Sequence, residues 1–381
     1  MIENKIIIFG PNLINSLGLI RSFGEKGIKP ILILEPCNPL LGIVQYSKYI
    51  EKIHYLKKIE DVIDVLKKYY WTEKKKPIIL CGGDTSIALL DKYYDELNEH
   101  FFFFNAGDKG RIGYYLNKAN TFPLAEQSEF SIIRTWTIAN VSNLPQNITF
   151  PCIIKGNNST HCSKGDMVIC QNYDELKEHL HEGIEYLIQE YIEKDYELDI
   201  VGISYNHGQD VYAPAAVRKI RESLTRQSDY ICLEEIKKYE SLYGFSINSL
   251  LASIGYEGLF SVEVMCKDNK AYFLEINLRN DGTCYLYTAA GCNLPYIWAL
   301  YCSEKLDDEL LAQMTPKTPY TLMQLNDVTN VLARKVNLVT WVKQALGANA
   351  HFLWNKHDVK PFFYDCLVHI RQAIRKIKRI I

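Results

Sequence analysis

Short apolar runs alternate with helical patterns over the first hundred residues. Three runs are rich in β-branched side chains and occupy residues 5–9, 30–34 and 77–81. Apolar residues recur with helical spacing between and after them, at 16–26, 59–70 and 84–100. Fully apolar strands that alternate with helices are typical of a parallel sheet. We therefore predict a doubly wound βαβ domain, of the α/β class, over residues 1–107.

The pattern changes near residue 108, where strands begin to outnumber helices. Predicted strands occupy 151–155, 166–170, 186–189, 198–204, 211–220, 259–266 and 270–276, and predicted helices 173–181 and 246–254. This mixture favours an α+β domain with antiparallel sheets over residues 108–304, with a lid subdomain at about 134–192. A C-terminal extension with mixed helical patterns and an aromatic middle occupies residues 305–381.

Composition and charge narrow the function classes. The 381 residues are 48% hydrophobic and 23% charged, which excludes a disordered chain, and the net charge of −2 provides no basic field for a nucleic-acid partner. The 11 cysteines are odd in number and never form a CxxC pair, so they fit neither a disulfide framework nor a zinc site. With neither a signal peptide nor an apolar run long enough to span a membrane, we expect a cytoplasmic protein.

The turn after the first apolar run does not favour a dinucleotide. It begins at Gly10 and continues Pro11-Asn12-Leu13, without the GxGxxG glycines that let a pyrophosphate approach the backbone. The first domain is therefore interpreted as substrate-binding or purely structural.

The strongest chemical signal is a predicted hairpin with acids inside two apolar strands. Glu263 lies in the first strand, and Glu275, Asn277 and Arg279 follow at alternate positions after a polar turn at 267–270. Alternation places the last three side chains on one face. Glu263 joins them only if the hairpin register sets it opposite Glu275.

That register requires an odd-length loop or a bulge, for which we expect Asn269 to be the pivot because asparagine tolerates a left-handed conformation. Two carboxylates and an amide oxygen would then form a hard oxygen site suited to Mg²⁺, with Mn²⁺ as an alternative. The other interpretation is an acidic stripe that faces solvent.

The spacing of Glu263, Glu275, Asn277 and Arg279 resembles the hairpin that closes the active site of ATP-grasp ligases. This resemblance implies that the two glutamates and the asparagine hold Mg²⁺ on the phosphates of ATP. It also implies that Arg279 faces the acyl phosphate or the carboxylate substrate.

Two lysines resemble the phosphate-binding lysines of the same superfamily. Lys155 ends the apolar run 151–155, and Lys118 precedes it along the chain. A compact charge at a strand end suits phosphate, whereas the alternative is an ordinary surface lysine. The loop 156–165 takes the place of a phosphate lid, but it departs from the family by its few glycines, which restricts positive-φ conformations.

The segment Gln189, Glu190, Tyr191 and Ile192, followed by Glu197, resembles the adenine hinge and the ribose-binding acid. The resemblance implies that the backbone between Glu190 and Ile192 reads the adenine edge, while Glu197 accepts hydrogen bonds from ribose hydroxyls.

Cations at a further strand end complete the predicted nucleotide site. Arg218 and Lys219 are adjacent, and whichever faces inward is expected to contact the γ-phosphate. The polar stretch 222–228 would cover the substrate.

The resemblance implies an ATP-dependent ligase that joins a small carboxylate to an amine through an acyl phosphate, with ADP and phosphate released. The stretch 21–28 and the long C-terminal extension look more like D-aspartate ligase and the ATP-grasp proteins of cell-surface polysaccharide biosynthesis. Two alternatives stay open: a non-catalytic nucleotide-binding scaffold, motivated by the glycine-poor loop, and a carboxylating enzyme that resembles biotin carboxylase.

Residues 367–381 predict a basic amphipathic helix. Its apolar residues recur at i+3 and i+4, and it contains five cations and no acid. This pattern is typical of a helix at the surface of an anionic membrane, which predicts peripheral contact with the inner membrane face. The stripe equally suits packing on the protein's own surface or on a second subunit, which would give a homodimer.

Overall fold

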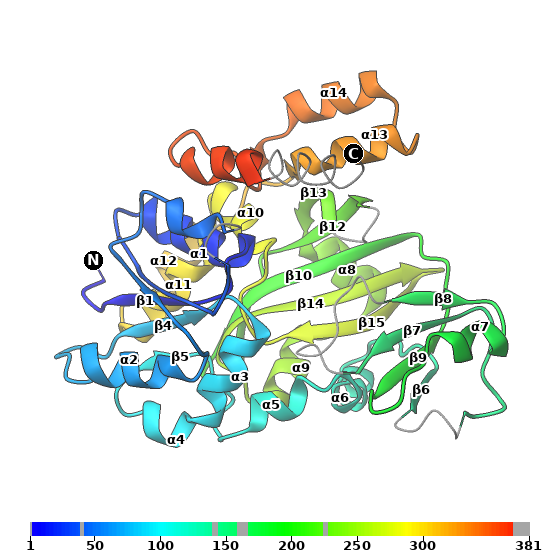
Figure 1. The fold of residues 1–381 in the computed structure, drawn as a ribbon, viewed down its shortest axis with the longest axis horizontal. Helices are drawn as coiled ribbons and strands as arrows, with labels where there is room; N and C mark the ends of the chain where they lie inside the picture. The colour runs from blue at the N-terminus through cyan, green and yellow to red at the C-terminus, as the bar shows by residue number, and fades with distance from the viewer. Residues whose placement is uncertain (1, 39–41, 139–143, 158–166, 224–227, 369–381) are drawn as a thin grey trace, which may run out of the picture.

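Three β-sheets organise the chain in a computed structural model that describes residues 2–38, 42–138, 144–157, 167–223 and 228–368 (Figure 1). The predicted basic helix lies outside these ranges from residue 369 onward. Residues 158–165 of the predicted lid loop 156–165 also lie outside these ranges, as do residues 224–227 of the predicted covering loop. The described part of the chain contains no helix long and apolar enough to cross a membrane.

The first sheet is parallel and five-stranded, in the order β3-β2-β1-β4-β5. Its strands are β1 (Ile6–Gly10), β2 (Ile31–Leu34), β3 (Lys52–Tyr55), β4 (Ile78–Cys81) and β5 (Phe102–Phe103), and its helices include α1 (Ile14–Gly24), α2 (Asp61–Tyr69), α3 (Asp84–Lys92) and α4 (Tyr94–Leu97). The predicted doubly wound architecture is confirmed. The single helix predicted over 84–100 is instead two helices, interrupted at Tyr93.

The order of this sheet creates a crevice. β1 lies between β2 and β4. The chain runs from β1 to β2 and β3 on one side of β1, and then returns to β4 and β5 on its other side. Ligands of open α/β sheets bind at such a switch point, outside the carboxyl ends of the strands. Here those ends are Gly10 of β1 and Cys81 of β4.

The largest sheet has eight strands and carries the predicted hairpin. Its order is β15-β14-β10-β12-β13-β16-β17, with β11 paired to β10, and the strands are β10 (Tyr196–Tyr205), β11 (Asp210–Tyr212), β12 (Ala215–Glu222), β13 (Ser228–Glu235), β14 (Gly258–Lys267), β15 (Lys270–Asn277), β16 (Tyr320–Met323) and β17 (Ala350–His351). The strand predicted over 211–220 is two strands, separated at Pro214, which has no N–H to donate to a ladder.

A smaller antiparallel sheet of four strands lies within the region predicted as a lid. It has the order β6-β9-β7-β8, with β6 (Thr135–Ile138), β7 (Cys152–Gly156), β8 (Val168–Cys170) and β9 (Tyr186–Glu190). The helix α7 (Tyr173–Glu178) follows β8, and this part of the chain has a hydrophobic core of its own. The remaining elements before the large sheet are η2 (Val44–Tyr46), α5 (Arg111–Tyr115), η3 (Lys118–Asn120) and α6 (Phe122–Gln127).

The part of the chain that follows β15 packs on the first domain and on the large sheet. It adds β16 and β17 to the large sheet, where the sequence predicted mainly helical patterns. Its helices are α10 (Cys284–Ala289), α11 (Leu294–Cys302), α12 (Asp308–Gln313), α13 (Val328–Leu332) and α14 (Leu338–Gly347), and residues 360–368 are also helical. In Figure 1, α13 and α14 stand at the top, beyond the sheets.

Candidate active site

A bulge in the hairpin β14–β15 places two glutamates directly opposite each other. The turn contains only Asp268 and Asn269, both with positive φ (47° and 57°). Val264 pairs with Phe273, but Glu263 pairs with Glu275, so Leu274 is the extra residue. A regular ladder would have paired Glu263 with Leu274. The condition for Glu263 to face Glu275 is met by a bulge, one of the two expected routes. Asn269 has the left-handed conformation expected of it, but the register changes at Leu274 rather than at Asn269.

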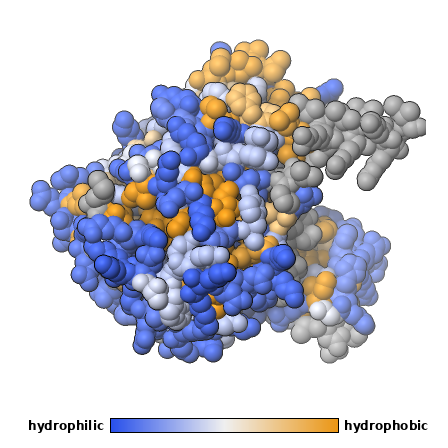
Figure 2. All heavy atoms as spheres, turned by 60° about the vertical axis from the view of Figure 1, so that its left-hand side comes forward, coloured by the Kyte–Doolittle hydropathy of each residue, from blue (hydrophilic) through white to orange (hydrophobic). Residues whose placement is uncertain are grey.

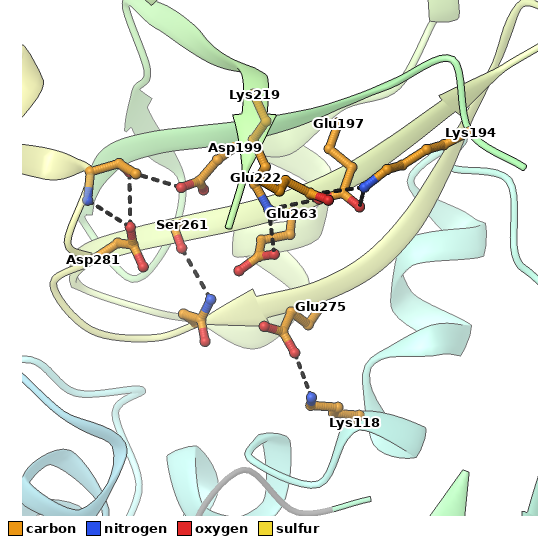
Figure 3. A network of polar contacts seen from close by, with 12 residues as sticks. Lys118, Lys194, Glu197, Asp199, Lys219, Glu222, Ser261, Glu263, Glu275 and Asp281 are labelled. Atoms are coloured by element: carbon orange, nitrogen blue, oxygen red, sulfur yellow. Dashed lines mark hydrogen bonds and ion pairs between the residues drawn. The ribbon is translucent and has the colours of Figure 1, made fainter. Parts of the chain in front are cut away.

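Neighbouring strands extend this pair into a polar row. Asp199 of β10 pairs with Glu263 of β14, and Asn277 pairs with Ser261, to whose Oγ its Nδ2 donates at 3.1 Å. In Figure 3 the labelled side chains of β14, β15 and β10 lie along one face of the large sheet. The row thus combines residues that are far apart in the sequence.

Lys219 is the cation that faces this row. Its Nζ lies 2.7 Å from Oε2 of Glu197 and 3.2 Å from Oε2 of Glu263 (Figure 3). Burial lowers the pKa of Lys219, but Glu263, Glu197 and Asp199 oppose it and raise the pKa well above its usual value. The ammonium group therefore remains charged although its side chain is buried.

Arg218 points to the opposite side of β12. Its side chain is 41% exposed, its guanidinium lies over the ring of Tyr196 at 4.7 Å, and Glu234 is 3.8 Å away. Adjacent strand residues face opposite sides of a sheet, so only one of the two cations can join the carboxylates. The expectation that one of them faces inward is met by Lys219, and the geometry does not support a phosphate contact for Arg218.

Glu197 lies between two lysines. Its Oε1 is 2.7 Å from Lys194 and its Oε2 is 2.7 Å from Lys219. Burial raises the pKa of Glu197, but the two lysines outweigh it and lower the pKa to about 2. Glu197 is therefore an ionised acceptor, as the predicted ribose contact requires.

Asp199 is a buried acid that the sequence analysis did not single out. Its Oδ2 accepts a hydrogen bond from Thr283 at 2.8 Å, whereas its Oδ1 has no partner in the described structure. Burial raises the pKa of Asp199 well above its usual value, and Asp281 and Glu263 add to the effect. The available signal was an acid inside the apolar segment Leu198-Asp199-Ile200, two residues after Glu197.

Lys118 approaches the row from the other side, with Nζ 2.5 Å from Oε2 of Glu275 (Figure 3). Its turn is held by Asn157, a buried residue that follows β7: the Asn157 carbonyl accepts from the N–H of Lys118 at 3.1 Å, and its Nδ2 donates to Glu185 at 2.6 Å. Asn157 was not predicted as a site residue. Lys155 is buried two positions earlier, in β7. The two predicted phosphate lysines are thus connected through the first residues of the predicted lid loop.

The predicted adenine hinge lies at the end of β9. The N–H of Glu190 donates to Arg134 at 3.0 Å, and that of Tyr191 donates to Pro151 at 2.9 Å. The side chain of Gln189 is also engaged, because its Nε2 donates to Oγ1 of Thr135 at 2.8 Å. Because the N–H groups of Glu190 and Tyr191 are already bonded, the backbone groups that we expect to contact the adenine edge are the Glu190 carbonyl and the N–H of Ile192.

Arg279 joins the hairpin to the first sheet. Its Nε donates to Asp84 at 2.8 Å, its Nη1 lies 3.2 Å from Asp281, and its Nη2 donates to Oδ1 of Asn277 at 3.1 Å. Burial lowers the pKa of Arg279, but the surrounding acids, Asp84 first, raise it above its usual value. Asp84 begins α3 directly after the turn Gly82-Gly83, and it is a second site residue that was not predicted.

The sequence of residues 123–296 matches the family model of the ATP-grasp domain. These residues form an ATP-grasp domain. The predicted resemblance is thereby confirmed, and so is the fold class. The matched segment contains the polar row, the hinge and Lys155, whereas Lys118 precedes it.

Individual relatives are distant. A formate-dependent phosphoribosylglycinamide formyltransferase from Wolinella succinogenes is 23% identical over 171 residues, which span 41% of that protein. Among solved structures, an ADP complex of N5-carboxyaminoimidazole ribonucleotide synthetase has a TM-score of 0.66 at 13% identity, with 87% of this chain and 85% of that one covered.

An L-amino acid ligase from Bacillus licheniformis has a TM-score of 0.63 at 13% identity (82% and 78% covered). A biotin carboxylase complex from Campylobacter jejuni has a TM-score of 0.62 at 17% identity (83% and 74% covered). These likenesses concern the fold. The fold shared with these proteins extends over most of the chain.

The opposed glutamates fit the magnesium that ATP-grasp proteins are expected to use with ATP. Glu263 and Glu275 supply carboxylates, and Asn277 supplies an amide oxygen. The described residues contain no group of three or more His, Cys, Asp or Glu side chains that forms a complete metal cage. Mg²⁺ is commonly held by one or two carboxylates together with substrate phosphates, so a partial set of this kind suits a metal that arrives with the nucleotide.

The switch point of the first sheet contains polar atoms without partners. They are Oγ of Ser16, Oε1 of Glu35 and Oδ1 of Asn280, each without a hydrogen-bond partner in the described structure. Glycine is required beside them, because a Cβ at Gly10 or Gly82 would lie within 2.7 Å of Ser16 Oγ. Burial raises the pKa of Glu35 to about 7, and the charge of Asp84 adds to the effect.

Proposed function

We propose that this protein is an ATP-dependent ligase that activates a small carboxylate as an acyl phosphate and transfers it to an amine. The observation that carries the proposal is the bulge that sets Glu263 opposite Glu275, with Lys118 and Lys219 directed at the same pair of carboxylates. A purely structural sheet would gain little from burying four such charges on one face, since the desolvation of ions is costly.

Each charged group has a role in this proposal. Glu263, Glu275 and Asn277 hold Mg²⁺, which neutralises phosphate charge when it is bound. Lys118, Lys155 and Lys219 contact phosphate oxygens, Glu197 binds the ribose, and residues 189–192 bind adenine. The protein contributes positioning and electrostatic stabilisation rather than a covalent nucleophile.

The lysine–glutamate pairs support this proposal, because each ion has a partner before a nucleotide binds. Lys118 pairs with Glu275, and Lys219 pairs with Glu263. With the nucleotide bound, Lys118 and Lys219 would contact phosphate oxygens in place of the carboxylates, and Glu263 and Glu275 would hold Mg²⁺, which would neutralise phosphate charge. The total charge then stays balanced, so neither partner is left buried and unpaired.

The proposed reaction has two steps, a phosphoryl transfer followed by an acyl transfer. A carboxylate oxygen of the first substrate attacks the γ-phosphorus, and the bond to ADP breaks. The nitrogen of the second substrate then attacks the acyl carbon, phosphate leaves, and the nitrogen loses a proton. Arg279 lies beside Asn277 at the end of the hairpin, where it can orient the carboxylate or the acyl phosphate.

The amine is proposed to enter through the switch point of the first sheet. Arg279 is bound to Asp84 at that crevice, so the crevice borders the metal site. Asp84 is already paired with Arg279, so Glu35, whose Oε1 has no partner in the described structure, is the acceptor proposed for a cationic amine. Glu35, with a pKa of about 7, can also accept the proton that the attacking nitrogen releases.

Trapping with hydroxylamine tests the proposal. The full-length protein is incubated with ATP, Mg²⁺ and one candidate acid at a time, and hydroxamate and ADP are both measured. We expect hydroxamate and ADP in equal amounts with the correct acid. ATP binding without ADP release for every acid would favour the scaffold, and ADP release that depends on bicarbonate alone would favour the carboxylating enzyme. Both outcomes would overturn the amide-forming activity.

A further inference from the structure

Exposed hydrophobic side chains gather on the C-terminal part of the molecule. More than half of the large hydrophobic side chains that are exposed in the described chain lie between residues 325 and 367. The most exposed are Leu346 (84%), Leu332 (80%) and Val339 (66%). In Figure 2 hydrophobic residues form a patch at the top of the molecule, where α14 stands in Figure 1.

The helix α14 presents one continuous apolar stripe. At 100° per residue, Leu338, Val339, Val342 and Leu346 fall within an arc of about 100° of its circumference. All four are exposed, and no residue of α14 is buried. Leu332, at the end of α13, adds to the apolar surface. We call α13 and α14 together the apolar cap.

The charges of residues 328–357, which include the apolar cap, all have one sign, and the acid that precedes them, Asp327, is buried and paired with Arg221. From residue 328 to 357 the sequence contains four cations and no acid: Arg334, Lys335, Lys343 and Lys356. The next acid, Asp358, is buried and bound to Arg21. The net charge of the whole chain is −2, so this region differs strongly from the rest.

This charge distribution distinguishes between two occupants of the apolar cap. A second copy of the chain, packed cap to cap, would bring the same cations together without acids to balance them. An anionic lipid surface instead attracts the cations while its acyl region accepts the apolar stripe. We propose that the apolar cap docks on an anionic membrane surface, which would keep the ligase beside a substrate at that surface.

Vesicle co-sedimentation of the full-length protein tests this inference. The probes are vesicles of phosphatidylcholine alone and of phosphatidylcholine mixed with phosphatidylglycerol. We expect the wild-type protein to pellet with the mixed vesicles at low salt and to remain in the supernatant with the neutral vesicles. Added salt should release it, because the electrostatic attraction is screened.

Two variants locate the binding surface. V339S/V342S/L346S removes most of the stripe, and I184S/L242S removes two exposed apolar side chains elsewhere, of which Leu242 lies on α8 (Ile236–Tyr243). We expect the first variant to lose vesicle binding by on the order of tenfold and the second to bind like the wild type. Thermal unfolding and ATP affinity of both variants should match the wild type, since every changed side chain is exposed.

Three results would overturn the inference. One is equal binding of V339S/V342S/L346S and the wild type to the mixed vesicles. Another is equal binding of the wild type to both kinds of vesicle. The third is sedimentation velocity that shows a dimer of the wild type and a monomer of V339S/V342S/L346S without vesicle binding, which would identify a second copy as the occupant.

Discussion

Arg279 and Asp84 form an ion pair of 2.8 Å that connects the end of the hairpin β14–β15 to the start of α3. The two residues are 195 positions apart in the sequence, and both side chains are largely shielded from water. Through this pair, the phosphate side of the proposed site and the crevice of the first sheet share one guanidinium group. The geometry of one side therefore depends on the other.

The first prediction concerns this shared guanidinium. Arg279→Lys keeps the charge but loses the planar fork that contacts Asp84, Asp281 and Asn277 at once. We expect kcat/KM for ligation to fall by about tenfold or more. Steady-state kinetics of ADP release measures the loss. Arg111→Lys is the matched control, because Arg111 pairs with Asp108 at the surface; an equal loss in both variants would contradict the role of Arg279.

Glu275→Gln should abolish Mg²⁺-dependent ADP formation while the fold is retained. The amide keeps the volume of the side chain but removes the charge that Mg²⁺ and Lys118 both require. ADP release over a Mg²⁺ titration is the measurement, with Glu240→Gln on the exposed face of α8 as the control. Wild-type turnover by the Glu275 variant would exclude Glu275 as a metal ligand.

The neighbours Lys219 and Arg218 provide a matched pair. Lys219→Gln removes the cation between Glu197 and Glu263, whereas Arg218→Gln removes one on the other side of the same strand. We expect affinity for a non-hydrolysable ATP analogue to fall by about tenfold or more for Lys219→Gln and to stay within about twofold for Arg218→Gln. Calorimetric titration compares them, and the reverse order would mean that Arg218 is the phosphate ligand.

A fourth prediction concerns an ion pair that should affect the stability of the fold but not the affinity for ATP. Arg21 and Asp358 are fully buried and paired at 3.1 Å, and Arg21 also donates to the carbonyls of Phe352 and Leu353. Arg21→Met leaves Asp358 buried without its cation, so we expect the free energy of unfolding to fall by about 3 kcal/mol or more. Urea titration measures it. ATP affinity of the folded variant should be unchanged, and a stability equal to wild type would contradict the structural role.

Three of the five strands of the first sheet, β1, β2 and β4, could be predicted from the sequence because parallel strands covered on both faces are apolar throughout. The sequence analysis did not predict β3, which has exposed residues at both ends, or β5, which has two residues. The hairpin was predictable for another reason. Burying acids inside apolar strands costs free energy, so their presence there indicates a function. The sequence showed that Glu263 can join the site only if it pairs with Glu275. It did not show where the bulge lies, because that depends on how Leu274 packs.

Contacts between distant segments could not be predicted. Arg21 and Asp358 are 337 residues apart, and nothing in the local sequence of either indicates the other. The strands β16 and β17 have only four and two residues, too few for a period-two pattern to distinguish them from loops. Asp84 looked like the start of a helix, and its pairing with Arg279 required the assembled structure.

The last prediction uses the pKa of Glu35, which is raised from its ordinary value of 4.5 to about 7. Between these values the folded protein keeps a proton that the unfolded chain has lost. The stabilisation from this group is therefore present below about pH 4.5 and is lost as the pH rises through 7, by up to about 3 kcal/mol. Glu35→Gln should remove this part of the pH dependence.

Urea unfolding of the wild type and Glu35→Gln at pH 5 and pH 7.5 tests it, with Glu240→Gln as a control that retains the wild-type slope. A saturating cationic amine substrate should also restore stability to the wild type at pH 7.5, because an ammonium group beside Glu35 favours the carboxylate. The amine should restore less in Glu35→Gln. If the free energies of unfolding of the wild type and Glu35→Gln changed in parallel with pH, Glu35 would not titrate in this range. If the amine stabilised both proteins equally, it would bind elsewhere.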